Sequence, residues 1–416
     1  MKIITLSNDE FDAFARRHKY FTYFQTENYA NVSKIIDGFD HHYLGFCDES
    51  GNLIGASLML YKTLFWGYKY AYSPRGLLID YEDTQLVAEV TSELKKLLKK
   101  QKFIFIKIDP PIIASERDKD GNIIKFNENV NRILNAFKKN NYEHLGFNLY
   151  DESILPRWNV SAKLHNDARV LFNNFSPDVK EKISYANSMA LIVKQDETND
   201  INKFYEFMKK VNIKKSKKYF QTLADSFNNK LKIFYAYIDT QKYTENANKL
   251  YAQEQEKNYN LANIIQTGDT IKYNIPKAIN AKMESDKMLN NYKKDVIDST
   301  KLLKSNPEGI ICGASLAIEE ENGVNILINY EDSEYSRYSV NTLMTYELMK
   351  FYGKLNYKYI NLGSVTGNFN ANSKYYPSLL NKLGFNSSIL EYIGEFNMIL
   401  NPTMYKIYKN KYKIKR

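Results

Sequence analysis

Residues that build covalent or metal-based sites are scarce in this 416-residue sequence. It contains only 2 cysteines, Cys47 and Cys312, and 5 histidines. Both cysteines lie in apolar, strand-like surroundings, which favours buried free thiols over a disulfide or a metal site. His41 and His42 are adjacent, but no histidines have the spacing typical of zinc ligands. We therefore expect no metal site and no cofactor held by these residues.

Long apolar runs are missing as well. No segment has the roughly 18 consecutive apolar residues that a membrane span needs. The short apolar start passes at once into Asn8, Asp9 and Glu10, unlike a secretory signal. We therefore expect a cytoplasmic protein. Neither a Gly-x-Ser-x-Gly turn nor a Cys/His signature predicts a covalent nucleophile.

The chain is long and carries a net positive charge. A chain of 416 residues exceeds the roughly 250–300 residues that one hydrophobic core supports, so we expect two core-bearing domains. The formal net charge of +10 favours an anionic partner, such as nucleic acid, phosphate groups or an acidic membrane face. A lysine-rich solvated surface explains the same charge without any partner.

One structural unit occurs twice in the sequence. The strand-like segments 53–60 and 311–318 share the tetrapeptide Gly-Ala-Ser-Leu. Each copy is followed by a helix signal, a strand and a second helix that ends near a Gly-Phe pair. The ranges are 87–100, 103–108 and 133–141 in the first copy, and 342–354, 357–362 and 378–383 in the second. This order predicts a duplicated α/β unit with mixed sheets, and Gly146 and Gly384 are placed near left-handed helix ends.

The second copy is interrupted by a polar segment. The strand at 234–238 has its natural hairpin partner at 309–318, and the residues between them, 240–305, are rich in Lys, Glu, Asn and Gln. Apolar residues recur there at helical spacing on both sides of a break near Gly268 and Pro276. The pattern predicts an antiparallel coiled-coil hairpin, which serves either as an oligomerisation surface or as a ligand-binding arm.

The C-terminal third resembles the Fem family of aminoacyltransferases. The segment 359–369, Tyr-Ile-Asn-Leu-Gly-Ser-Val-Thr-Gly-Asn-Phe, is similar to the family's strand-to-loop motif, and 379–386 to its helix end. Thinner matches follow in the family's order at 25–32, 72–81, 108–110 and 180–186. The resemblance implies two tandem GNAT-like domains, 1–155 and 156–239 with 306–400, an inserted arm at 240–305 and a basic C-terminal helix at 401–416.

The same resemblance implies the function. Fem enzymes move an amino acid from aminoacyl-tRNA onto the stem peptide of a peptidoglycan precursor, either lipid II or UDP-MurNAc-pentapeptide. Aminoacyl-tRNA is then a co-substrate and no cofactor is required. The expected amino acid is Gly, Ala or Ser, and contact with the inner membrane face and pairing with other Fem proteins are further expectations.

The resemblance also implies residue roles. Lys382 matches the active-site lysine, which stabilises the developing oxyanion or the tRNA 3′ end, although a helix-end lysine complementing the helix dipole is the plain alternative. Asp109 is expected to accept or hold the attacking amine, or else to cap a turn. Lys180 is expected to bind the precursor's diphosphate, and Lys34 is expected to bind substrate as the counterpart of an early family lysine. Lys34 lies one place beyond the family's position, which falls on Ser33.

Two further residues lie in the matching motifs. Arg75 belongs to the Tyr-Ser-Pro-Arg-Gly segment, and Gly363 belongs to the strand-to-loop segment. Both are expected to contact substrate.

Two basic clusters contain interleaved aromatic residues. The first spans 204–220 and the second is the tail 405–416. The first pattern suits binding of a phosphate backbone, and the second suits an anionic membrane surface. A solvated helix face and a frayed C-terminus are the alternatives.

Two other functions remain open. An acyl-CoA-dependent N-acyltransferase of the same fold needs a glycine-rich turn that cradles pyrophosphate, but the stretches 337–342 and 83–86 contain no glycine. A non-catalytic RNA-binding or scaffold protein is the second alternative, which the presence of Lys382 and Asp109 disfavours.

Overall fold

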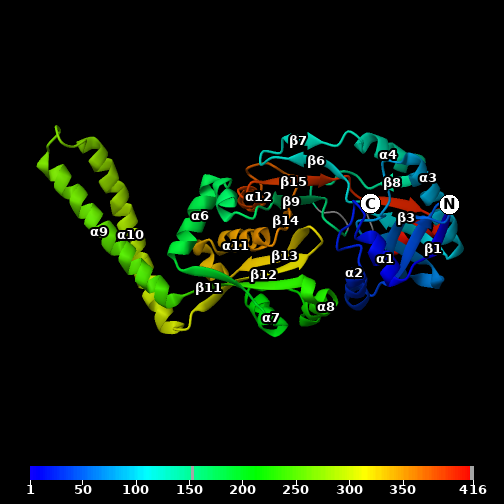
Figure 1. The fold of residues 1–416 in the computed structure, drawn as a ribbon, viewed down its shortest axis with the longest axis horizontal. Coiled ribbons are helices and arrows are strands. Elements are labelled where there is room, and N and C mark those ends of the chain that lie inside the picture. Colours follow the sequence, from blue (N-terminus) through cyan, green and yellow to red (C-terminus); the bar gives the residue numbers. More distant parts are fainter. Residues whose placement is uncertain (151–153, 413–416) are drawn as a thin grey trace.

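The computed structural model describes residues 1–150 and 154–412. Two mixed β-sheets lie next to one another, and a long helical arm projects from the second (Figure 1). Within the described residues, the first sheet has seven strands, in the order β1 (Lys2–Thr5), β2 (Asp40–Cys47), β3 (Leu53–Thr63), β4 (Lys69–Ser73), β5 (Phe103–Ile108), β16 (Phe396–Ile399) and β8 (Tyr142–His144).

The second sheet is larger. Its nine strands in the described part of the chain are ordered β10 (Leu191–Gln195), β11 (Leu231–Ile238), β12 (Ile310–Glu319), β13 (Gly323–Glu331), β14 (Tyr359–Ser364), β9 (Trp158–Lys163), β15 (Ser387–Tyr392), β6 (Ile113–Arg117) and β7 (Ile123–Phe126).

The duplicated unit predicted from the sequence is present in both sheets. The repeated tetrapeptides lie in β3 and β12, each of which has an antiparallel neighbour on both sides. The strand that follows in each sheet, β4 or β13, pairs in parallel with β5 or β14. A parallel pair needs a crossover connection, and the helices α3 (Thr84–Lys100) and α11 (Val340–Lys354) supply it.

The two sheets exchange their closing strands. After β8, the last strand of the first copy, the chain enters the second sheet as β9, between β14 and β15. After β15, the chain returns to the first sheet as β16, between β5 and β8. The hairpin β6–β7, which falls within the expected domain 1–155, pairs with β15 of the second sheet. Strand pairing therefore departs from the expected domain ranges. The hairpin β6–β7 lies within 1–155 but joins the second sheet, and β16 lies within 306–400 but joins the first. An apolar strand pattern does not say which sheet the strand joins.

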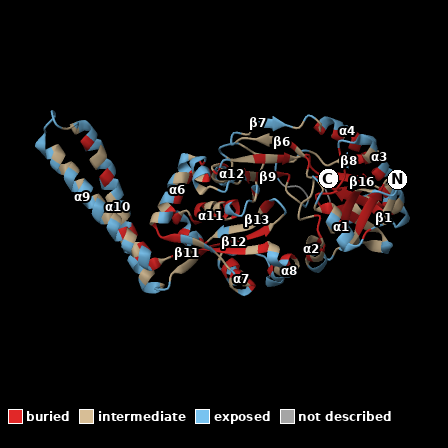
Figure 2. Cartoon of the chain, viewed as in Figure 1, coloured by how far each residue is buried: buried red, intermediate tan, exposed pale blue. Residues whose placement is uncertain are grey.

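Helices cover both sheets and complete the cores (Figure 2). The remaining helices of the first unit are α1 (Asn8–Ala15), α2 (Glu27–Val32), α4 (Val130–Lys139) and α13 (Pro402–Lys411), with a π-helix, η1, at Ser33–Asp37. Those of the second unit are α5 (Ala168–Asn173), α6 (Pro177–Ser188), α7 (Ile201–Lys210), α8 (Lys217–Phe227) and α12 (Tyr376–Leu383). Short 3₁₀ turns lie at Phe65–Gly67, Asn228–Lys230 and Ser333–Tyr338. Cys47 and Cys312 are free and buried.

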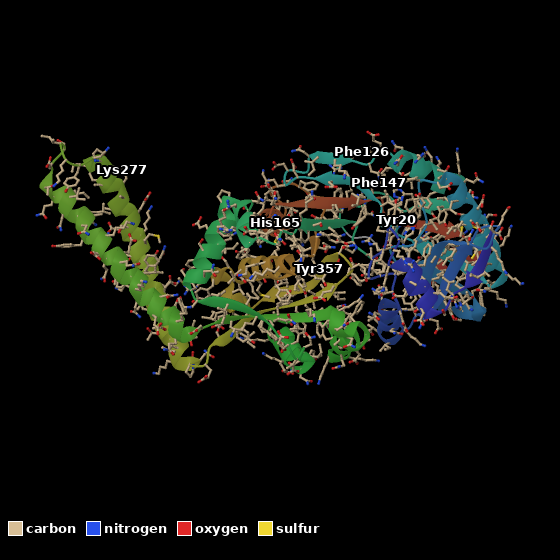
Figure 3. All side chains as sticks on the ribbon, viewed as in Figure 1. Tyr20, Phe126, Phe147, His165, Lys277 and Tyr357 are labelled. Carbon is tan, nitrogen blue, oxygen red and sulfur yellow. The ribbon has the colours of Figure 1, made fainter. Side chains whose placement is uncertain are left out.

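The inserted segment forms two packed helices, α9 (Thr240–Thr267) and α10 (Ile275–Ser305). At the base, Arg337 of the second unit contacts Asp298 of α10 at 2.6 Å, and the Tyr243 hydroxyl of α9 donates to Asp295 at 3.3 Å. Figure 3 shows Lys277 near the free end of the arm. The arm is thus anchored at one end only. None of the helices in the described part of the chain combines the length and apolarity that a membrane crossing requires.

The prediction that a left-handed glycine ends α12 is wrong. Gly384 has a right-handed φ of −61°, and the left-handed residue is Asn386, with φ 54°. Glycine is needed at 384 because a Cβ there would lie 2.4 Å from Cγ2 of Val179, a side chain of α6. After α4 the left-handed residue at the helix end is Asn141, and Gly146, which also has a positive φ of 95°, lies beyond β8.

A buried ion pair ties the returning strand to the first sheet. Lys107 of β5 donates to Glu395, just before β16, at 2.7 Å, and both side chains are largely buried. We expect Lys107→Met to lower the free energy of unfolding by about 3 kcal/mol, because the carboxylate stays buried with less compensation. The exposed pair Lys96–Glu93 provides the control, and Lys96→Met should change stability by less than about 1 kcal/mol. Equal urea midpoints for the two variants would contradict the role of the buried pair.

Candidate active site

A cleft opens where the two sheets meet. Its first cavity has a volume of about 520 Å³ and is lined by both units, with Arg75, Tyr23 and Tyr29 from the first and Glu320, Tyr359 and Tyr392 among those from the second. A second cavity of about 370 Å³ contains Lys382, Asn381 and Ser378. The two cavities share Ile326, Leu327, Gly363 and Ser364 in their linings. The two cavities therefore adjoin, with Gly363 where their linings meet, and together they are called the groove below.

Lys382 lies in the last turn of α12 and reaches the groove. Its ammonium group donates a hydrogen bond to the carbonyl oxygen of Ser364 at 2.9 Å. Among the residues that the structure describes, no carboxylate lies within ion-pair distance of it. Burial lowers the pKa of the Lys382 ammonium to about 8. The site thus holds a partly desolvated positive charge without a balancing carboxylate.

Gly363 lies beside that lysine. It is the last residue but one of β14 and has φ 89°, a left-handed conformation that favours glycine. A Cβ at this position would lie 3.5 Å from Nζ of Lys382. The structure therefore brings together Lys382 and Gly363, two of the predicted site residues.

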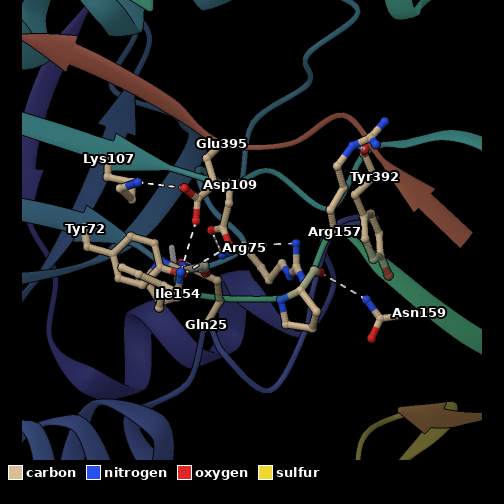
Figure 4. Close-up of polar contacts among 12 residues, drawn as sticks. Gln25, Tyr72, Arg75, Lys107, Asp109, Ile154, Arg157, Asn159, Tyr392 and Glu395 are labelled. Carbon is tan, nitrogen blue, oxygen red and sulfur yellow. Dashed lines mark hydrogen bonds and ion pairs between the residues drawn. The ribbon is translucent and has the colours of Figure 1, made fainter. Parts of the chain in front are cut away.

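Arg75 and Asp109, two further predicted residues, lie together in the first unit, with their charged groups 3.7 Å apart (Figure 4). The Arg75 guanidinium donates to the carbonyl oxygen of Pro156 at 2.7 Å, and its carbon lies 4.6 Å from the ring centre of Tyr392. Asp109 accepts a hydrogen bond from the Arg75 backbone N–H at 2.7 Å and one from the Tyr72 hydroxyl at 3.1 Å.

Asp109 is only 1% exposed and lines neither cavity, whereas Arg75 lines the first. Burial raises the pKa of the Asp109 carboxyl to about 6, and the charge of Arg75 opposes that shift. Gln25 holds the same turn from the other side by donating to the carbonyl oxygen of Pro74 at 2.6 Å. Asp109 therefore orients the turn that presents Arg75.

Lys180 and Lys34 lie outside the linings of both cavities. Lys180 lies on α6, and its ammonium group donates to the carbonyl oxygen of Asn173, the last residue of α5, at 2.8 Å. Lys34 is exposed on η1, although its neighbours Ile36 and Asp37 line the first cavity. The structure does not bring either lysine together with Lys382.

The comparisons with known proteins decide the family. The FemAB family model matches residues 6–413. The chain belongs to the FemAB family. It is 26% identical to aminoacyltransferase FemB of Staphylococcus epidermidis, over 98% of this chain and 97% of the relative. It is 24% identical to lipid II:glycine glycyltransferase of Staphylococcus haemolyticus, over 98% and 95%.

The fold of this FemAB protein is shared with a solved relative. A crystal structure of FemX superposes with a TM-score of 0.73 at 20% identity, over 98% of this chain and 99% of that chain. The chain is a transferase, because it belongs to this family and because relatives that match it over nearly its full length are transferases.

Sequence reasoning missed two groups that line the groove of this FemAB protein. Glu320 accepts a hydrogen bond from the Tyr23 backbone N–H at 2.7 Å, and burial raises the pKa of its carboxyl to about 6. Lys215 lines the same cavity and lies 4.7 Å from the ring centre of Tyr219. Lys215 belonged to the predicted basic cluster, but its spacing did not distinguish it from the other lysines. Glu320 follows a strand without any local signal.

The junction glycine offers a test of the groove. We expect Gly363→Ala to cost about 1 kcal/mol of stability through its backbone conformation and to lower transferase activity, because the strained backbone adjoins Ser364, whose carbonyl oxygen accepts the hydrogen bond from Lys382. Gly51 has φ 87° and an added Cβ there meets nothing within 4 Å, so Gly51→Ala is the matched control. Thermal melts should show similar losses for both variants, while only Gly363→Ala loses activity. Equal activity in the two variants would separate Gly363 from function.

Proposed function

We propose that this FemAB protein transfers an amino acid from aminoacyl-tRNA to the stem peptide of a peptidoglycan precursor. The observation that carries the proposal is the placement of Lys382, whose ammonium group lines the second cavity, which adjoins the first cavity between the two units. The names of the relatives support the acceptor class, since one is a lipid II:glycine glycyltransferase. The transferred residue is proposed to be a small amino acid, Gly, Ala or Ser.

The proposed transfer requires the enzyme to position the two substrates, and it requires no covalent enzyme intermediate. The amine of the stem peptide attacks the ester carbon, a tetrahedral intermediate forms, and the bond to the ribose oxygen breaks as the amide forms. Negative charge develops on the carbonyl oxygen in this step, and a fixed cation in a desolvated groove stabilises it. Lys382 supplies such a cation. No cofactor is needed because the ester is already activated.

The amine must lose a proton before or during the attack. Of the predicted residues, Asp109 is placed to act through Arg75 rather than by direct contact. Glu320 lines the first cavity, and its raised pKa suits a proton acceptor near neutral pH. We therefore assign the base role to Glu320 and a positioning role to Asp109.

The cationic side chains along the groove suit the anionic parts of the substrates. Arg75 and Lys215 line the first cavity, where a diphosphate-bearing precursor meets them. We also propose that Lys180 on α6 and Lys34 on η1 contact substrate outside the two cavities. Contact with the inner membrane face follows if the acceptor is lipid-linked, and dimerisation with another Fem protein is compatible with this arrangement.

The pKa of Lys382 predicts the pH profile. The stabilising ammonium is present below pH 8 and is lost as the pH rises through about 8, so turnover should fall above that value. Lys382→Arg keeps its charge and should remove this decline, because the pKa of arginine lies above roughly 12. Lys382→Ala should lower kcat by about 10²–10³-fold with little change in precursor binding.

The measurement is transfer of radiolabelled amino acid from charged tRNA to a purified precursor, followed across pH, with exposed Lys100→Ala as the control. Wild-type turnover in Lys382→Ala would exclude the proposed role. Transfer from acetyl-CoA to a free amine, in place of transfer from tRNA, would favour the N-acyltransferase alternative, and no transfer at all would favour a scaffold.

The arm generates a separate prediction about the tRNA. The helices α9 and α10 meet at their base, where the Thr240 hydroxyl donates to the carbonyl oxygen of Asn306 at 2.6 Å. Replacing 251–292 by a short turn should leave the second sheet intact, because Ala247, Val296 and Leu302, which lie in or against its core, are kept. If the arm holds the tRNA body, this variant should raise the Kd for charged tRNA about tenfold and leave precursor binding unchanged. An unchanged tRNA affinity would assign the arm to oligomerisation.

A further inference from the structure

The β3–β4 turn and helix α13 form an exposed aromatic and basic surface on the first unit. Its outward residues are Trp66, Ile407 and Tyr412 with Lys406, Lys409 and Lys411, which together are called the Trp66 surface below. Trp66 is 73% exposed and has φ 56°, at the tip of a turn closed by a hydrogen bond from the Leu64 N–H to the carbonyl oxygen of Tyr68. The side chain with the largest apolar area in the turn is thus held in solvent.

A rigid aromatic layer supports this surface. Tyr70 of β4 stacks on Phe105 with ring centres 5.5 Å apart, and both pack against Tyr408 of α13. Lys411 connects the helix to the turn, since its ammonium group lies 4.8 Å from the ring centre of Phe65. The turn and the helix therefore present one continuous surface and not two separate protrusions.

The duplicated fold shows that this exposure is not a requirement of the turn. The equivalent β12–β13 turn of the second unit is acidic, and the first unit covers it. Glu320 accepts from the Tyr23 N–H, and Glu321 pairs with Arg16. The β3–β4 turn occupies the same place in its own sheet, yet within the described chain nothing covers Trp66.

The charge around the surface has one sign. No Asp or Glu occurs between Leu53 and Ile79 or from Phe396 onward. The carboxylates close enough to influence the tyrosines of this layer, Asp37, Asp40 and Glu143, come from neighbouring elements. Lysines beside outward Trp and Tyr side chains match the interface of an anionic bilayer, where aromatic rings settle at headgroup level and each lysine gains from the surface potential.

We propose that the Trp66 surface docks this protein on an anionic lipid bilayer. Phosphates of RNA also attract lysines, but the outward Trp66 and Ile407 gain free energy from an apolar medium, which favours the bilayer. The role of this docking rests on the proposed function, because docking would bring the enzyme to a lipid-linked acceptor. Binding of the protein to vesicles is measured without any transfer reaction.

The experiment is flotation of the full-length protein with phosphatidylcholine vesicles that contain or lack phosphatidylglycerol. Binding is expected only with phosphatidylglycerol and should weaken as salt is raised. Trp66→Ser should lower the partition coefficient about tenfold. Lys406→Gln with Lys411→Gln should lower it roughly fivefold per lysine and flatten the salt dependence.

Matched controls come from exposed residues elsewhere. Tyr259 of the arm is 67% exposed, and Lys138 and Lys139 end α4 at the surface. Tyr259→Ser and the double variant Lys138→Gln with Lys139→Gln should leave vesicle binding unchanged. Thermal melts establish that all variants fold. Equal losses in the controls, or no vesicle binding by the wild type, would overturn the proposal.

Two outcomes separate this inference from others. If Trp66→Ser weakens binding of charged tRNA while vesicle binding is unchanged, the surface binds RNA and the proposal fails. Transfer to a water-soluble stem peptide should be unaffected by Trp66→Ser. A wild type that transfers to this peptide but ignores vesicles overturns the docking surface alone, whereas one that binds vesicles but transfers nothing overturns the proposed function alone.

Discussion

The exchange of closing strands between the two sheets is the constraint on which the groove depends. Because β9 completes the second sheet and β16 completes the first, each unit needs the other for its backbone hydrogen bonds. Buried ionic contacts accompany both crossings, with Arg157 against Glu391 at β9 and Lys107 against Glu395 at β16. The walls of the groove are therefore held in a defined relative position, which a hinge between independent domains would not provide.

Electrostatics divide the groove into two regions. Lys382 faces Ser364 with a partly desolvated positive charge, while across the junction Arg75 is held by Asp109 and stacked on Tyr392. The buried carboxylate of Asp109 keeps the Arg75 guanidinium oriented and balances part of its charge. Lys382 has no such counter-charge among the described residues, so its charge is less balanced by its surroundings than that of Arg75. The two cations thus differ in electrostatic environment because of their neighbours.

Local sequence patterns predicted the duplicated unit and the helical insertion, and a matching motif singled out Lys382 and Gly363, since each depends on residues close together in the chain. The strand exchange was not predicted, because β9 and β16 have the alternation of ordinary strands and nothing local names their partners. Glu320 was missed for the same reason. It becomes a groove residue only because the first unit packs against its turn.

By itself the sequence determined that the protein has two α/β units, an inserted helical hairpin, no apolar run of spanning length and a family-like C-terminal motif, because these follow from periodicity, composition and local similarity. Only the tertiary structure decided that the units share strands, that Asp109 lies buried behind Arg75, and that Trp66 stays uncovered while its counterpart turn is covered. These facts depend on contacts between residues hundreds of positions apart, and the free energy of such contacts is set by packing that local patterns do not encode.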